Sequence, residues 1–200
     1  MKKTVFTVIL AMATISMYAQ KFGVKAGVNF STYTGSDADG SKALTGFQVG
    51  GLYELPISEA FFIQPEVLLT LKGAKFSDEG YTEKYTPFYI QVPIKALYKF
   101  NVGTGKISIA AGPYLALGIA GKDKASGDGE SESSNLFSKE DGADETILKR
   151  FDLGLSSAVG YEFENGLFLN FEYSPGLLNV ANGGGNIKNS TLSLVAGFKF

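Results

Sequence analysis

The chain has 200 residues, a formal net charge of −2 and 25 glycines, and all of its aromatic residues are Phe or Tyr. It contains no cysteine and no histidine, which excludes disulfides, thiolate sites and both the usual general base and the commonest metal ligand. The small net charge gives no indication of a nucleic-acid partner, and the length allows one domain or two small ones.

The first segment, MKKTVFTVILAMATISMYAQ, has the pattern of a secretory signal peptide. Lys2 and Lys3 form a basic start, residues 5–17 are nearly all apolar, and Ala19 is a small residue at the expected cleavage point. We therefore expect residues 1–19 to be a signal peptide and residues 20–200 to form one barrel domain; a buried N-terminal helix is the alternative. No later apolar run reaches the length of roughly 18 residues that a membrane-spanning helix needs.

From residue 21 onward, apolar and polar residues alternate with the period of two that indicates β-strands. Most of the eight expected strands are about as long as the roughly 9–11 residues of a tilted transmembrane strand. They cover residues 22–32, 45–55, 61–71, 88–100, 107–119, 151–163, 167–175 and 190–200. Short turns at 56–60, 101–106 and 164–166 alternate with longer loops at 33–44, 72–87, 120–150 and 176–189. This alternation is typical of an up-and-down barrel with two unlike ends.

Three prolines lie inside neighbouring expected strands, at Pro65, Pro93 and Pro113. Proline cannot donate a hydrogen bond to a strand ladder and is usually found at an edge or a bulge. Because a closed barrel has no edge, we expect bulges or a local break where these strands meet.

The longest loop, residues 120–150, is rich in glycine, serine and acidic residues, and we expect it to be mobile. Within it, Asp128, Glu130 and Glu132 alternate as oxygen donors and form a weak candidate calcium site. A solvated acidic loop is the favoured interpretation of these three residues, and no cofactor is expected.

Sorting the strand residues by parity gives two contrasting faces. One face carries large apolar residues and no charge, and its aromatic residues gather near the strand ends. The other face is rich in Gly, Ala and Ser and carries nine charges of nearly balanced sign. These are Lys25, Glu54, Glu66, Lys95, Lys99, Asp152, Glu162, Glu172 and Lys199.

A transmembrane barrel turns its apolar face outward, whereas a soluble lipocalin-like barrel turns that face inward. The interior of an eight-stranded barrel is just wide enough for side chains to fill, so small residues with a few long charged ones fit it better than large apolar groups. We therefore expect an all-β, eight-stranded antiparallel transmembrane barrel of the OmpA/OmpX type, with the nine charges paired in the lumen.

The last strand, TLSLVAGFKF, places Leu192, Leu194, Ala196, Phe198 and Phe200 on one face. This arrangement resembles the insertion signal of bacterial outer-membrane proteins, which the barrel assembly machinery reads. An ordinary last strand is the alternative.

Several phrases resemble the outer-membrane β-barrel "porin family" of Bacteroidetes, related to the PorT type. They are KFGVKAGVNFST (21–32), IQPEVLLTLKGAKF (63–76), YIQVPIKALYKF (89–100), AAGPYLALGIAG (110–121), FDLGLSSAVGYEF (151–163) and SLVAGFKF (193–200). The resemblance implies the same fold over almost all of residues 21–200 and a link to protein secretion, but it does not imply an open channel.

The expected function is a non-enzymatic, monomeric barrel with a filled lumen, in the outer membrane, with a structural or surface-interaction role. The acyl transferases and proteases known among barrels of this size depend on histidine, which this chain lacks. The expected partners are the lipid bilayer, the assembly machinery and an unidentified extracellular ligand at the loops, with both termini periplasmic. A small passive pore, an accessory secretion component and a soluble lipocalin-like binding barrel are the alternatives.

Overall fold

A computed structural model describes residues 21–78, 81–127, 130–137, 146–182 and 185–200, so the expected signal peptide lies outside the described residues. The described residues form ten antiparallel strands. These are β1 (Lys21–Thr34), β2 (Ser41–Pro56), β3 (Phe61–Leu71), β4 (Ala74–Asp78), β5 (Tyr81–Val102), β6 (Gly105–Gly127), β7 (Glu130–Asn135), β8 (Phe151–Glu162), β9 (Leu167–Pro175) and β10 (Lys188–Lys199). In the described part of the chain, no helix has the length and apolar character needed to cross a membrane.

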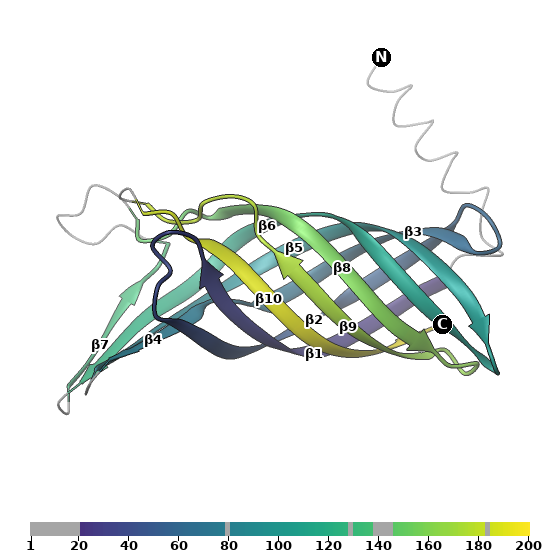
Figure 1. Cartoon of the computed structure of the whole chain (residues 1–200), viewed down its shortest axis with the longest axis horizontal. Helices are drawn as coiled ribbons and strands as arrows, with labels where there is room; N and C mark the ends of the chain where they lie inside the picture. The colour runs from purple at the N-terminus through teal and green to yellow at the C-terminus, as the bar shows by residue number, and fades with distance from the viewer. Residues whose placement is uncertain (1–20, 79–80, 128–129, 138–145, 183–184) are drawn as a thin grey trace, which may run out of the picture.

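Eight of the strands close into a ring in the order β1–β2–β3–β5–β6–β8–β9–β10, and β10 pairs with β1 to complete it. The eight-stranded barrel expected from the sequence is therefore confirmed. The other two strands are additions at the end of the barrel that carries the long loops (Figure 1). There β4 continues β3 between β2 and β5, and β7 folds back on the outer part of β6.

The barrel strands follow the expected positions closely, and β3 and β9 coincide with them. The expectation of loops over 72–87 and 120–150 is wrong in part, because β4, the start of β5, the end of β6 and β7 lie there. The expected strands end where the apolar alternation stops. The pairing of β5 with β6 continues past this point through polar residues, up to Tyr81 opposite Gly127.

A break of two residues, Lys72 and Gly73, separates β3 from β4. Gly73 has a φ of 128°, and a Cβ at this position would lie 2.0 Å from the carbonyl oxygen of Tyr85. Glycine is therefore required here on both counts, since other residues rarely adopt this backbone conformation. After this break, β4 takes the place of β3 between β2 and β5, so the wall of the barrel extends beyond the apolar part of β3.

The three prolines interrupt strand pairing without shifting its register. Pro65 pairs with Ile94 and Leu68 with Gln91, but the ladder skips the two positions between them. The pairing of β5 with β6 skips two positions after Pro93 in the same way. The expected local break in pairing is therefore present. The register of β5 and β6 does shift, but between Phe88 and Tyr89 and not at a proline.

The apolar face of the strands points outward over the whole ring. Val67 and Phe171 are 60% and 47% exposed, whereas all nine charged residues of the other face are buried. The lipocalin-like alternative, in which the apolar face lines the interior, is therefore wrong.

Candidate functional site

The middle of the lumen holds four charged residues from four different strands. Lys25 Nζ lies 2.9 Å from Glu66 Oε2 and 2.6 Å from Glu172 Oε1. Lys95 forms ion pairs with the same two carboxylates, directly with Glu66 and at 3.5 Å with Glu172. Gln48 Nε2 also donates to Glu172 at 3.1 Å. Two ammonium groups and two carboxylates thus form a neutral, buried middle layer.

A second neutral group, the turn-end layer, lies nearer the short turns. Lys99 Nζ is 2.6 Å from Glu54 and 2.7 Å from Glu162. Lys199 Nζ contacts the same two carboxylates at 2.6 and 2.7 Å. Lys21, at the start of β1, adds a more exposed contact to Glu162 at 3.2 Å. The four central side chains therefore form a closed square in which each charge has two partners of opposite sign.

A third ionic contact, the loop-end pair, joins Lys72 to Asp152 at 3.4 Å. Tyr114 and Asn189 both donate to Asp152 Oδ2, at 3.0 and 2.9 Å. The ammonium of Lys72 also lies 4.3 Å from the ring centre of Tyr114 and 5.4 Å from that of Tyr89. The aromatic faces thus add a favourable environment for this buried cation.

The ion pairs of the three groups determine the chemical state of the carboxylates in the lumen. A buried charge is costly unless it is paired and its remaining hydrogen bonds are made. Each carboxylate of the three groups is paired with at least one ammonium group, and the three groups are buried in the lumen between the turn end and the loop end. All five carboxylates are thus engaged by ammonium groups, although the buried Asp152 Oδ1 has no hydrogen-bond partner among the described residues.

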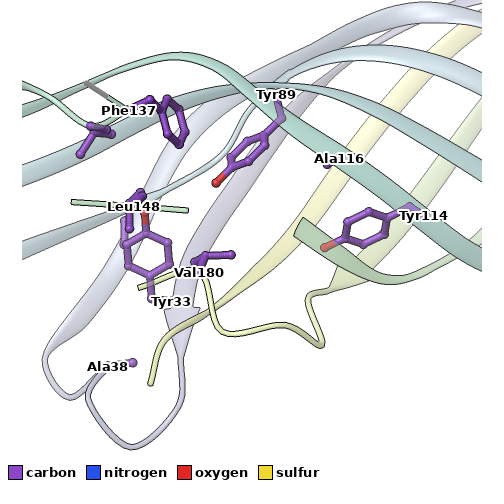
Figure 2. Packing of buried hydrophobic residues seen from close by; sticks show 10 residues of the cluster. Tyr33, Ala38, Tyr89, Tyr114, Ala116, Phe137, Leu148 and Val180 are labelled. Carbon is purple, nitrogen blue, oxygen red and sulfur yellow. The ribbon is translucent and has the colours of Figure 1, made fainter. Parts of the chain in front are cut away.

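The mouth of the barrel at the loop end is covered by segments of the two longest loops, which we call the cap (residues 136–137, 146–150 and 176–182). Figure 2 shows Phe137, Leu148 and Val180 gathered with Tyr89 in the barrel interior, and all four are buried. The backbone N–H of Leu148 donates to the carbonyl of Leu136 at 3.1 Å, within the loop expected to be mobile. A few apolar side chains thus pack part of this otherwise polar loop against the barrel, and its mobility stays a prediction.

The cap is attached to β6 by hydrogen bonds from Arg150 and by close packing of Phe137 against Gly118. The guanidinium of Arg150 donates to the carbonyl oxygens of Gly118 and Phe137, at 3.0 and 2.8 Å, and lies over the Phe137 ring. A Cβ at Gly118 would lie 2.4 Å from that ring. The absence of a side chain at Gly118 therefore makes room for Phe137.

A hydrogen-bonded brace joins the β1–β2 loop to the loop that precedes β10. Asp37 Oδ2 accepts hydrogen bonds from Ser36 Oγ at 2.7 Å and from the backbone N–H of Asn186 at 2.9 Å. Both bonds favour the charged carboxylate and lower the pKa of Asp37 below its ordinary value. The brace links two of the long loops at the rim.

Parity analysis missed two residues that complete the ionic groups. Lys72 lies one step past the expected end of the third strand, although it continues the inward series Glu66, Leu68 and Thr70. Extending the parity count by one step would have placed it in the lumen. Lys21 was missed because it precedes the first expected strand by one residue.

The candidate calcium ligands are not brought into a described site. Asp128 lies outside the described residues, and Glu130 and Glu132 belong to β7. In the portions of the chain that the structure describes, no group of three or more acidic residues is arranged to hold a metal ion.

The expected insertion signal lies at the seam that closes the barrel. Leu192, Leu194, Phe198 and Phe200 are all exposed on the outer face. The backbone N–H of Phe200 donates to the carbonyl of Phe22 at 2.8 Å, and the two rings stack with centroids 6.1 Å apart. The end of β10 is thus tied to the start of β1, where the ring closes.

Comparison with known proteins supports this architecture. The family model described as "Outer membrane protein beta-barrel domain" matches residues 18–182. A comparison with curated proteins gave no match.

Two solved outer-membrane proteins share the fold at low sequence identity, and a third is similar at a lower TM-score. Neisserial surface protein A is 15% identical with a TM-score of 0.54, over 90% of this chain and 97% of that one. A major outer membrane protein from Thermus thermophilus is 14% identical with a TM-score of 0.50, over 92% and 100%. Ail, the attachment invasion locus protein of Yersinia pestis, is 18% identical with a TM-score of 0.47, over 90% and 98%. At these identities the likeness concerns the fold alone.

Proposed function

The chain belongs to the outer membrane protein beta-barrel domain family, and we propose that it is a non-enzymatic barrel that acts through its rims and loops. The filled lumen is the observation that carries this proposal. The middle layer, the turn-end layer and the loop-end pair occupy the interior, and the cap covers the mouth. A barrel of eight strands has little interior space beyond that of its side chains.

The chemistry of the chain supports a role without catalysis. Histidine and cysteine are absent from the sequence. The interior carboxylates that could serve as paired acids, such as Glu66 and Glu172, are each bound by lysine ammonium groups. A glycosidase pair needs one protonated and one free carboxyl group beside a substrate, which this packed environment disfavours.

The proposed orientation places the short turns in the periplasm and the long loops outside the cell. Outer-membrane barrels have short periplasmic turns and longer extracellular loops, and this chain shows the same asymmetry between its two ends. The cap, β4 and β7 would then lie at the extracellular end, available to a surface ligand. The exposed residues of β10, including Phe198, and the following residue Phe200 are proposed to be read by the assembly machinery.

The finer assignment to the PorT type of Bacteroidetes rests on the phrases of the sequence. An accessory role in secretion follows from that resemblance alone, and a monomeric state is the simplest arrangement for a closed ring. The packing of the interior supports the main proposal over a small passive pore.

Conductance in planar lipid bilayers tests the proposal directly. Purified protein should insert, as shown by heat-modifiable migration on gels, and should give no stable single-channel steps because the lumen is filled. Reproducible unitary steps from the unmodified protein would show that a continuous water path exists, and the pore alternative would then replace this proposal.

A further inference from the structure

Four lysines lie directly opposite one another on four neighbouring strands at the loop end. Lys42 of β2 pairs with Lys75 of β4, Lys75 with Lys84 of β5, and Lys84 with Lys124 of β6. Neighbouring strands are about 4.8 Å apart, so the four Cα atoms span roughly 14 Å. We call this set the lysine row.

The lysine row lies on the outer surface of the barrel wall. Lys75 lies between Ala74 and Phe76, and both of these neighbours belong to or pack against the interior apolar cluster. Tyr85, next to Lys84, packs against the same cluster. Because successive side chains of a strand point to opposite faces, the lysines point outward.

Charge is segregated between the two faces of this part of the wall. The hydroxyl of Tyr85 donates to Glu83 at 2.7 Å, and Asp123 lies opposite Tyr85, so both acidic residues share the inner face. On the outer face, Lys42 donates to the backbone carbonyl of Ser77 at 3.2 Å. Among the residues that the structure describes, no lysine of the row forms an ion pair with a carboxylate.

Such an arrangement is unfavourable for the protein alone. Like charges directly opposite one another on neighbouring strands are destabilising. Three consecutive lysine–lysine pairs repeat this repulsion across four strands. An anion bound from outside the chain would relieve the repulsion along the whole row.

The lysine row continues the lipid-facing surface. On β5, Lys84 is four residues beyond Phe88, roughly 14 Å along a strand that rises about 3.4 Å per residue. The tilt of barrel strands, about 35–45°, lowers this to roughly 10 Å above the apolar band. Lys122, opposite Thr86, lies two residues nearer to it. Lysine side chains can bend toward a membrane surface, so these ammonium groups can reach the headgroup layer.

We infer that the lysine row binds the phosphate groups of lipids in the leaflet that surrounds the loop end. The inference rests on the proposed function, because it requires the barrel to be inserted in a membrane. A headgroup phosphate is favoured over a soluble polyanion because the row lies on the same outer face as the apolar band, within reach of the headgroup layer. The tails of a bound lipid would then lie against the exposed residues below, such as Ile90.

Lipid titration followed by native mass spectrometry tests this inference. The probes are lipid A with two phosphates, lipid A with one phosphate, and phosphatidylcholine. The unmodified protein should retain the diphosphorylated lipid best. The variant Lys84→Gln/Lys124→Gln should bind it about 25-fold more weakly, since each lysine near an anionic surface accounts for about a fivefold effect.

The variant Lys106→Gln/Lys188→Gln removes the same charge outside the row and should bind the lipid as well as the unmodified protein does. Equal losses of binding in both double variants would overturn the inference, and so would equal retention of the lipids with two, one and no lipid A phosphates.

Tripolyphosphate is then added to the protein in phosphatidylcholine nanodiscs. If it binds the row as tightly as the diphosphorylated lipid does, the site is one for soluble polyanions and the inference is also overturned. Heat-modifiable migration of every variant shows separately whether insertion has failed.

Discussion

At the scale of single residues, the interior is organised by charge pairing. The middle layer joins Lys25 and Lys95 to two carboxylates, and the loop-end pair joins Lys72 to Asp152. Parity alone predicts that the four carboxylates and lysines of the middle layer and Asp152 face the lumen, because a charge on the lipid side costs about 2–4 kcal/mol near the bilayer midplane. The charged residues separate into three groups because of strand register and tilt, and the parity of residue numbers gives no information on either. Lys72 was missed because it lies beyond the apolar part of its strand.

Asp152→Asn tests whether pairing stabilises the interior. The substitution leaves the buried ammonium of Lys72 without the carboxylate it contacts, so the free energy of unfolding should fall by about 3–5 kcal/mol. Lys72→Met in the same chain removes the unpaired charge, and the double variant should recover most of the loss. Urea unfolding in lipid vesicles measures both effects. An unchanged stability in Asp152→Asn, or a double variant less stable than the single one, would contradict this account.

At the scale of elements, the strands within the apolar band are predictable from their alternation, and those beyond it are not. The expected bounds of β9 agree with the structure, since lipid-facing and lumen-facing residues alternate along it. Beyond the band, the outer face of β5 and β6 is polar, as at Lys84 and Lys124, and hydrophobic alternation no longer marks the strand. The cap could not be predicted either, because Phe137 and Leu148 lie in an acidic and serine-rich segment, and their contact with Val180 joins two loops that are far apart in the sequence.

Phe200→Ala tests the proposed assembly role of β10. We expect a reduced amount of folded protein in the outer membrane of living cells, because the assembly machinery would recognise this strand less well. Phe163→Ala is the matched control, since Phe163 is also an exposed aromatic residue at the turn end. Both variants should lose a similar, small free energy of unfolding in vesicles. A normal level of folded Phe200→Ala protein, measured by heat-modifiable migration, would remove the proposed role.

At the scale of the whole molecule, one orientation accounts for the barrel. The apolar face surrounds the ring, the nine predicted charges lie inside, and the two ends differ in the length of their loops. The number of strands in the ring and the direction of each face were predictable, because the strand period and the volume of a small barrel constrain them. The additional strands lie beyond the apolar alternation, although β4 pairs with β5 and β7 with β6 across tight connections. The cap depends on contacts between distant segments, such as Lys149 with Val180, which no local pattern records.

Fluorescence quenching by lipids with brominated chains measures this orientation most directly. The chain contains no tryptophan, so a single introduced tryptophan reports on its own position. On β9, Phe171 is 47% exposed on the outer face and Phe168 is 2% exposed inside. In proteoliposomes, Phe171→Trp should be strongly quenched and Phe168→Trp should keep nearly all of its fluorescence, with heat-modifiable migration showing that both variants fold. Equal quenching, or stronger quenching of Phe168→Trp, would contradict the account.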